Sequence, residues 1–137
     1  IYSFGGAPIF VIDSLPKREW KITDKIRKIC NYECQQAVFE YDDSTRIYAY
    51  FTSAITPHIG PETYWDLPGA ILGLATEDGS VTYFATKVEE RKIDMELYLP
   101  KFNDKKAKTK EDVIERAKKD FKFEKGIDKF IKEIFIW

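Results

Sequence analysis

The fold is decided by the stretch CQQAVFEYDDSTRIYAYF, residues 34–51. Apolar residues occupy every second position in both of its halves, namely Ala37, Phe39 and Tyr41, then Ile47, Ala49 and Phe51. This alternation is typical of strands that bury one face. Asp42, Asp43 and Ser44 lie between the halves, and these residue types favour tight turns. The stretch therefore predicts an antiparallel hairpin.

A second hairpin is predicted further along the chain, with strands at 70–76 and 81–88. The sequence EDGS separates them, and its Asp78-Gly79 pair suits a turn that needs a positive φ angle. Between the two hairpins lies the loop 53–69. Proline and glycine interrupt this loop too often for a regular element, and long loops within compact domains are often functional.

Two further strands are predicted ahead of the first hairpin. The apolar run 7–13 predicts a buried strand. Residues 19–29 predict a strand with a break near Thr23 and Asp24, and a turn at 31–33 then leads into the first hairpin.

The C-terminal part of the chain changes from a strand pattern to a helix pattern. Residues 93–99 alternate apolar and polar side chains, which predicts a half-buried strand. Thr109 and Asp112 have the spacing of a capping box, which predicts the start of a helix. Apolar residues within 127–135 recur at helical spacing, so two helices, or one bent helix, are expected to close the chain.

The chain of 137 residues is predicted to form a single domain, 1–137, with a β part at 7–100 and a helical C-terminus at 109–136. Its aromatic fraction of 15% favours a pleated sheet over a helix bundle. We predict a mainly β (α+β) fold, a curved antiparallel sheet or half-barrel with the C-terminal helix covering one face. Because the chain begins at Ile1 and not at methionine, we expect that it lacks an upstream N-terminal region.

Charge and hydropathy exclude two classes of partner. The 22 Lys and Arg nearly balance the 23 Asp and Glu, so the whole chain lacks the basic footprint that nucleic-acid binding normally needs. No stretch approaches the roughly 20 continuous apolar residues that span a bilayer. We therefore expect no nucleic-acid partner and no membrane-spanning segment.

Few residues in the sequence suggest chemistry. His58 is the only histidine, and a single loop histidine is more often polar surface than a catalyst or metal ligand. Cys30 and Cys34 form a CxxxC pair, which is neither the redox CxxC pattern nor a zinc pattern. They are either a disulfide candidate in an oxidising compartment or two independent thiols. No phosphate loop, HExxH or GxSxG motif is present, so we assign no catalytic residue, no metal ligand and no cofactor.

The loop between the hairpins is the predicted binding element. Its Tyr64, Trp65 and Leu67, together with Tyr48 and Tyr50, would either line an apolar groove or belong to the core. The residues predicted to bind are His58, Gly60, Pro61, Tyr64, Trp65, Leu67, Pro68 and Gly69.

Ordered motifs between Trp20 and Val88 resemble the GLPGLI family of Bacteroidetes proteins. The motifs are WKITD at 20–24, KI at 28–29, Tyr32 with Cys34 and Ala37, YAYFT at 48–52, GPE at 60–62 and LPGAIL at 67–72. Three positions depart from the family pattern. Asp66 stands at the first glycine of the name-giving motif, Ala70 at its leucine, and Cys30 at a position that is usually glycine before Tyr32.

The resemblance implies an exported protein of the periplasm or the outer-membrane region, of the kind often encoded beside TonB-dependent transporters. No activity is established for the family, so no catalytic residue is carried over. The pattern is also similar to the curved sheet of LolA-like lipoprotein carriers, which is an analogy of fold. The chain resembles the C-terminal portion of the family, and the CxxxC pair would be a feature of this chain and not of the family.

Our leading hypothesis is a non-enzymatic cell-envelope binding or accessory protein. It would use the concave face of the sheet and the 56–69 loop to hold a hydrophobic ligand, a peptide or a partner. A first alternative is a subunit of an outer-membrane-associated complex, for example with a TonB-dependent transporter. A second is an enzyme or redox protein that relies on His58 or on Cys30 and Cys34.

Overall fold

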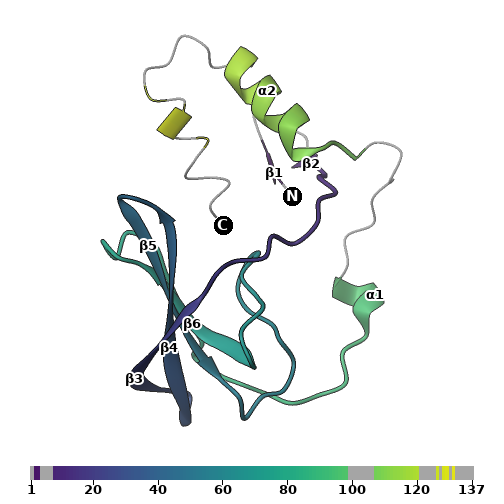
Figure 1. Cartoon of the computed structure of the whole chain (residues 1–137). Helices are drawn as coiled ribbons and strands as arrows, with labels where there is room; N and C mark the ends of the chain where they lie inside the picture. Colours follow the sequence, from purple (N-terminus) through teal and green to yellow (C-terminus); the bar gives the residue numbers. More distant parts are fainter. Residues whose placement is uncertain are drawn as a thin grey trace. The chain divides into compact units, whose positions relative to one another are not determined.

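The structure is a computed structural model that describes residues 2–3, 8–98, 107–120, 126, 128–129 and 131. The chain forms two compact units (Figure 1). One is Pro16–Glu90, which holds the large sheet, and the other combines Ile1–Leu15 with Arg91–Trp137. That the two units make one domain stays a prediction.

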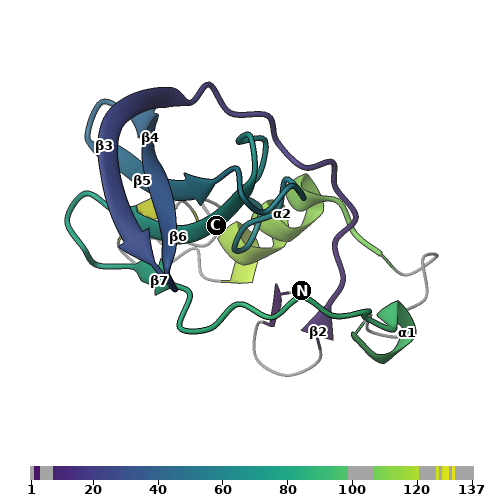
Figure 2. The same ribbon diagram turned by 90° about the horizontal axis from the view of Figure 1, so that it is seen from below.

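Five antiparallel strands in sequence order form the sheet unit. They are β3 (Lys21–Ile29), β4 (Tyr32–Asp42), β5 (Thr45–Thr52), β6 (Ala70–Thr76) and β7 (Thr82–Phe84). The sheet is curved but not closed, with β3 and β7 as its edges (Figure 2). Both predicted hairpins are confirmed, and so is the mainly β fold with a curved sheet and a C-terminal helix.

The turn between β3 and β4 is tighter than the sequence predicted. Ile29 pairs with Tyr32, so the turn consists of Cys30 and Asn31 alone, and the prediction of 31–33 was wrong. Both turn residues have positive φ angles, 49° and 69°, as in the two-residue turns that match strand twist. Cysteine seldom adopts this conformation, which is why the residue types did not reveal the turn. The predicted break in β3 is confirmed as a register shift between Ile22 and Ile26.

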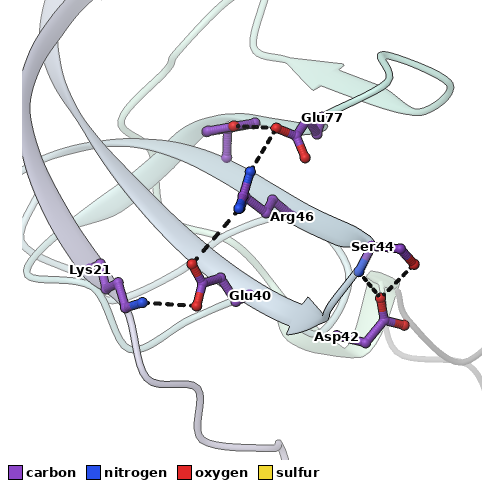
Figure 3. Close-up of polar contacts among 7 residues, drawn as sticks. Lys21, Glu40, Asp42, Ser44, Arg46 and Glu77 are labelled. Carbon is purple, nitrogen blue, oxygen red and sulfur yellow. Dashed lines mark hydrogen bonds and ion pairs between the residues drawn. The ribbon is translucent and has the colours of Figure 1, made fainter.

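Aspartates hold the other two turns. Oδ1 of Asp42 accepts hydrogen bonds from the amide and the hydroxyl of Ser44, both at 2.9 Å (Figure 3). Oδ1 of Asp78 accepts the same two bonds from Ser80, at 3.0 and 2.8 Å. Hydrogen bonds from Thr76 and Ser80 lower the pKa of Asp78 to about 2. These acidic residues therefore shape turns, as their position in the sequence suggested.

The second hairpin is shorter than predicted, because β7 ends at Phe84 and the predicted strand ran to 88. The amide of Ala85 still donates to the carbonyl of Leu72 at 2.8 Å. Beyond it, Val88 packs against a small apolar cluster. Ala85 and Val88 thus pack against the cluster beyond the end of β7. An apolar pattern in the sequence does not distinguish this packing from continued strand pairing.

The other unit contains the main departures from the predicted elements. The predicted strand 7–13 is reduced to β2 (Pro8–Ile9), which pairs with β1 (Tyr2–Ser3), and an isolated bridge between Val11 and Lys108. The predicted strand 93–99 was wrong over its described part, where α1 (Met95–Tyr98) forms instead.

The start of α1 has a local cause. The Asp94 carboxylate accepts from the amide of Glu96 at 3.1 Å, and its carbonyl accepts from the amide of Leu97 at 3.2 Å. Asp94 therefore begins a helical turn. Leu97 is 79% exposed, and no strand among the described residues pairs with this segment. Residue 99 lies outside the described residues.

The predicted capping box is confirmed at the start of α2 (Lys110–Asp120). The amide of Asp112 donates to Oγ1 of Thr109 at 3.1 Å, and the amide of Thr109 donates to Oδ2 of Asp112 at 3.0 Å. These bonds lower the pKa of Asp112. The helix buries Val113 and Ala117. Most of the helix predicted at 127–135 lies outside the described residues.

Each face of the large sheet buries apolar side chains. Cross-strand partners share a face. The register therefore places on one face, here called the loop face, the buried side chains of Ala37, Ile47, Ala49 and Leu74 together with Phe39. The opposite face carries a smaller cluster of Ile29, Cys34, Ala70 and Leu72.

Candidate functional site

The 56–69 loop is held in place by glycines at two close approaches. Gly69 has a φ angle of 135°, and a Cβ atom there would run into the backbone of Thr52. A Cβ at Gly60 would lie 2.5 Å from the carbonyl oxygen of Tyr64 and 2.9 Å from the Ile71 side chain. Both positions therefore need glycine for packing. The amide of Ile71 also donates to the carbonyl of Ile59 at 2.8 Å, which fixes the loop to β6.

Arg18 fastens the centre of the loop. Its guanidinium lies over the Tyr64 ring, 3.9 Å from the centroid. The same group donates to the carbonyl of Thr63 at 2.6 Å and to its hydroxyl at 2.9 Å. Burial lowers the pKa of Arg18 and raises the pKa of Tyr64 to about 12. The phenol is therefore neutral at physiological pH and makes a cation–π contact with a charged guanidinium.

Two tryptophans complete the attachment of the loop. Nε1 of Trp20 donates to the carbonyl of Trp65, and Nε1 of Trp65 donates to the carbonyl of Pro16, both at 3.1 Å. The Trp20 ring lies 5.8 Å from the Phe39 ring and 6.0 Å from the Tyr64 ring, between centroids. We call the set of Arg18, Trp20, Phe39, Tyr64 and Trp65 the loop clamp. It joins the 16–20 segment, the loop face and the loop into one packed layer.

The structure divides the predicted binding residues into internal and exposed ones. Tyr64 is 0% exposed, and Leu67 and Gly69 are also buried. Gly60, Pro61 and Trp65 are half-buried, while His58 and Pro68 are exposed. Tyr64 and Leu67 are thus part of the core, and Ile59 is the one large apolar side chain of the loop that is exposed. The other exposed loop residues are Thr56, Pro57, His58, Glu62, Asp66 and Pro68.

Tyr48 and Tyr50 do not share a surface with Tyr64 and Leu67. They alternate with Ile47 and Ala49, which lie on the loop face, so both tyrosines belong to the opposite face. The alternative in which Tyr48 and Tyr50 line one groove with Tyr64, Trp65 and Leu67 was wrong for that reason. On the opposite face the Tyr50 hydroxyl accepts from Nε2 of Gln36 at 3.1 Å, and Gln36 is buried.

A ladder of charged residues crosses the opposite face next to the turn between β4 and β5 (Figure 3). Nζ of Lys21 lies 2.8 Å from Glu40, which in turn lies 3.8 Å from Arg46. Arg46 also pairs with Glu77 at 3.1 Å. The hydrogen bond from Lys21 lowers the pKa of Glu40, and the bond to Glu77 raises the pKa of Arg46. These four side chains are between 46% and 69% exposed, so the pairs add little stability.

Cys30 and Cys34 are separate thiols in this structure. The Cys30 thiol donates to the carbonyl of Ala85 at 3.0 Å, and the Cys34 thiol donates to the carbonyl of Tyr32 at 3.6 Å. Burial raises the pKa of Cys34, which disfavours the reactive thiolate. The disulfide between the two cysteines stays a prediction.

Two residues that matter here, Arg18 and Arg27, were missed in the sequence analysis. Arg18 contacts Thr63, which lies 45 positions away in the sequence, and a local sequence pattern cannot predict such a contact. Arg27 lies over the rings of Phe84 and Tyr50, with centroids at 4.5 and 5.7 Å. One signal in the sequence could have indicated the Arg27 contact. The alternation along β3 determines which sheet face Arg27 lies on, and residues of neighbouring strands on that face include Tyr50 and Phe84.

Comparisons with family models, curated proteins and solved structures found no match for this chain. Among the described residues, no group of three or more His, Cys, Asp or Glu side chains is arranged to hold a metal ion. The helices in the described part of the chain are too short or too polar to cross a membrane.

Proposed function

We propose that this protein is a non-enzymatic binding protein of the cell envelope, and that its occupant is a partner protein or peptide held at the surface. One contrast carries the proposal. The apolar residues of the loop are used internally, whereas the edge strand β3 leaves Ile22 and Ile26 at 50% and 67% exposure. Exposed apolar side chains grouped on one strand favour a surface contact with another chain.

The cell-envelope part of the proposal comes from the resemblance to the GLPGLI family. Two of the three departures from the family pattern replace a glycine, at Cys30 and Asp66. Both residues have positive φ angles, 49° and 69°, the conformation that glycine adopts most readily. The backbone therefore has the shape that the family pattern would require at these positions. This supports membership of the family, and with it export to the periplasm or the outer-membrane region.

The partner class within the envelope is proposed on the same basis. An outer-membrane protein, for example a TonB-dependent transporter, would be reached from the periplasmic side by an exported protein of this size. A small hydrophobic ligand is the weaker candidate, because Tyr64 and Leu67 are already packed against their own chain.

Native mass spectrometry tests the proposal on the protein purified gently from its own cells. We expect a second protein chain to remain bound, and Ile22→Ser with Ile26→Ser to release it. Ile59→Ser is the matched control, since Ile59 is exposed to a similar degree but lies in the loop. A small molecule bound in place of a chain would contradict the partner proposal, and a bare monomer would contradict both forms of binding. The same spectra with and without reductant show whether Cys30 and Cys34 gain two hydrogens.

A further inference from the structure

Basic residues are concentrated in one short part of the sheet unit. Residues 16–90 contain eight Lys and Arg and twelve Asp and Glu, which gives a net charge of −4. Six of the eight basic residues lie within 17–28, where only Glu19 and Asp24 are acidic. The near neutrality of the whole chain hides this basic segment on an otherwise acidic unit.

Some of these cations are already used within the unit, and some are not. Arg18 belongs to the loop clamp, and Lys21 pairs with Glu40 (Figure 3). Lys25 and Lys28 are exposed on β3, and neither forms an ion pair with another described residue. Positive charge is therefore available along β3 for an outside group of negative charge.

The backbone of β3 is available as well. β3 is an edge of the sheet, and no strand in the described part of the chain pairs with its outer side. In an antiparallel edge strand, alternate residues point their N–H and C=O groups outward, which forms a template for another strand. After the register shift, residues 26–29 pair regularly with 32–35 of β4. This part of the edge therefore has the regular strand backbone that a partner strand needs.

Side chains on both faces flank this edge. Ile22 and Ile26 pair with Ala37 and Gln35, so they lie on the loop face, where both are exposed. Arg27 lies on the opposite face, over the ring of Phe84. An added strand would therefore meet apolar side chains on one face and a cation on the other.

The charge of the edge decides which strand fits it. A second copy of β3 would bring its own lysines and arginine against the same residues, and like charges opposite one another are destabilising. An acidic strand would be attracted instead. We propose that the outer edge of β3 binds an extended, acidic segment of a partner protein by strand addition. This inference rests on the proposed function and specifies the surface and the chemistry of the partner.

The test uses a labelled octapeptide of alternating valine and glutamate and follows its fluorescence anisotropy with the purified chain. We expect binding that weakens as salt is raised. An alternating valine–lysine octapeptide should not bind. The valine–glutamate peptide with every second amide methylated should bind at least about tenfold more weakly, because methylation removes the donors that a strand needs. Equal binding of the methylated peptide would overturn strand addition.

Variants of the protein locate the binding. Lys25→Glu should weaken binding by about threefold or more, as expected for one exposed charge pair. Lys87→Glu makes the same charge change outside the basic segment and should leave binding unchanged. Equal loss in both variants, or equal binding of the lysine and glutamate peptides, would overturn the proposal. So would binding of phosphatidylglycerol vesicles or of oligothymidine with no binding of the peptide.

The failure of this inference can be distinguished from the failure of the proposed function. If no peptide binds but a partner chain co-purifies from the native cells, only the proposal that the partner binds at β3 is contradicted. Crosslinking of that complex would then place the contact outside residues 21–29. If neither a peptide nor a partner chain binds, the proposed function falls as well.

Discussion

The 56–69 loop and the 17–28 segment touch each other through Arg18 and Trp20, yet they use their side chains in opposite ways. The loop has the aromatic and apolar residues that suggest a binding site, and it buries the largest of them. The 17–28 segment has the composition of an ordinary charged strand, and it exposes isoleucines, lysines and a sheet edge that no strand in the described part of the chain pairs with. Residue type alone therefore does not identify a binding surface. An apolar or charged side chain is available to a partner only if it is not already packed against its own chain.

The largest effect in this comparison is expected from Tyr64→Ala. Tyr64 is fully buried beneath Arg18, so truncation should cost about 4 kcal/mol of unfolding free energy. Urea denaturation followed by circular dichroism measures it. Tyr83→Ala is the control, because Tyr83 is partly exposed and should cost well under half as much. Equal costs would mean that the loop is not part of the core.

Gly69→Ala should have the next largest effect. The new Cβ would collide with the backbone of Thr52, and the φ angle of 135° is unfavourable for alanine. We expect a loss of about 3 kcal/mol in the same denaturation experiment. Gly79→Ala is the matched control, since Gly79 also has a positive φ angle but a Cβ atom there would meet nothing within 4 Å. That variant should lose only about 1 kcal/mol.

The sequence predicted those parts of the sheet whose signals are local. The bounds of β6 and the Asp78-Gly79 turn follow from alternation and turn chemistry, and the structure has both. The capping box of Thr109 and Asp112 is equally local and is also confirmed. The strand predicted at 93–99 was wrong because alternation does not show whether a pairing partner exists, whereas Asp94 favours a helical start.

The site was harder to predict than the fold. Whether Tyr64 lines a groove or fills the core depends on Arg18, a residue far away in sequence. Cys30 occupies a turn position with a positive φ angle, which cysteine seldom adopts, so the turn was predicted at the wrong residues. The basic segment was missed because opposite charges elsewhere cancel it in the composition of the whole chain.

Alkaline pH should weaken the attachment of the loop. Burial raises the pKa of Tyr64 from its ordinary value near 10 to about 12, so the folded state keeps a proton that the unfolded state loses. Stability should therefore fall as pH rises between about 10 and 12, by up to about 2 kcal/mol. Tyr64→Phe cannot titrate and should flatten this part of the pH profile. An unchanged profile in that variant would assign the loss to other groups.

A smaller effect is expected from Arg18→Met. This change removes the guanidinium over Tyr64 and its two bonds to Thr63, and it should cost about 1.5 kcal/mol. Arg46→Met removes an arginine from the exposed charge ladder and should cost about 0.5 kcal/mol or less. Thermal denaturation at low and high salt compares them, and only the Arg46 effect should fall clearly with salt.

Hydrogen exchange tests the contrast between the two regions most directly. The measurement follows amide exchange by mass spectrometry in the free chain and with the valine–glutamate octapeptide. We predict slow exchange at Tyr64, Gly69 and Ile71 in the free protein, whose amides donate to backbone carbonyls, and new protection confined to residues 21–29 when the peptide is added. Fast exchange across the loop, with new protection appearing at 56–69 instead, would contradict the account and return the binding site to the loop.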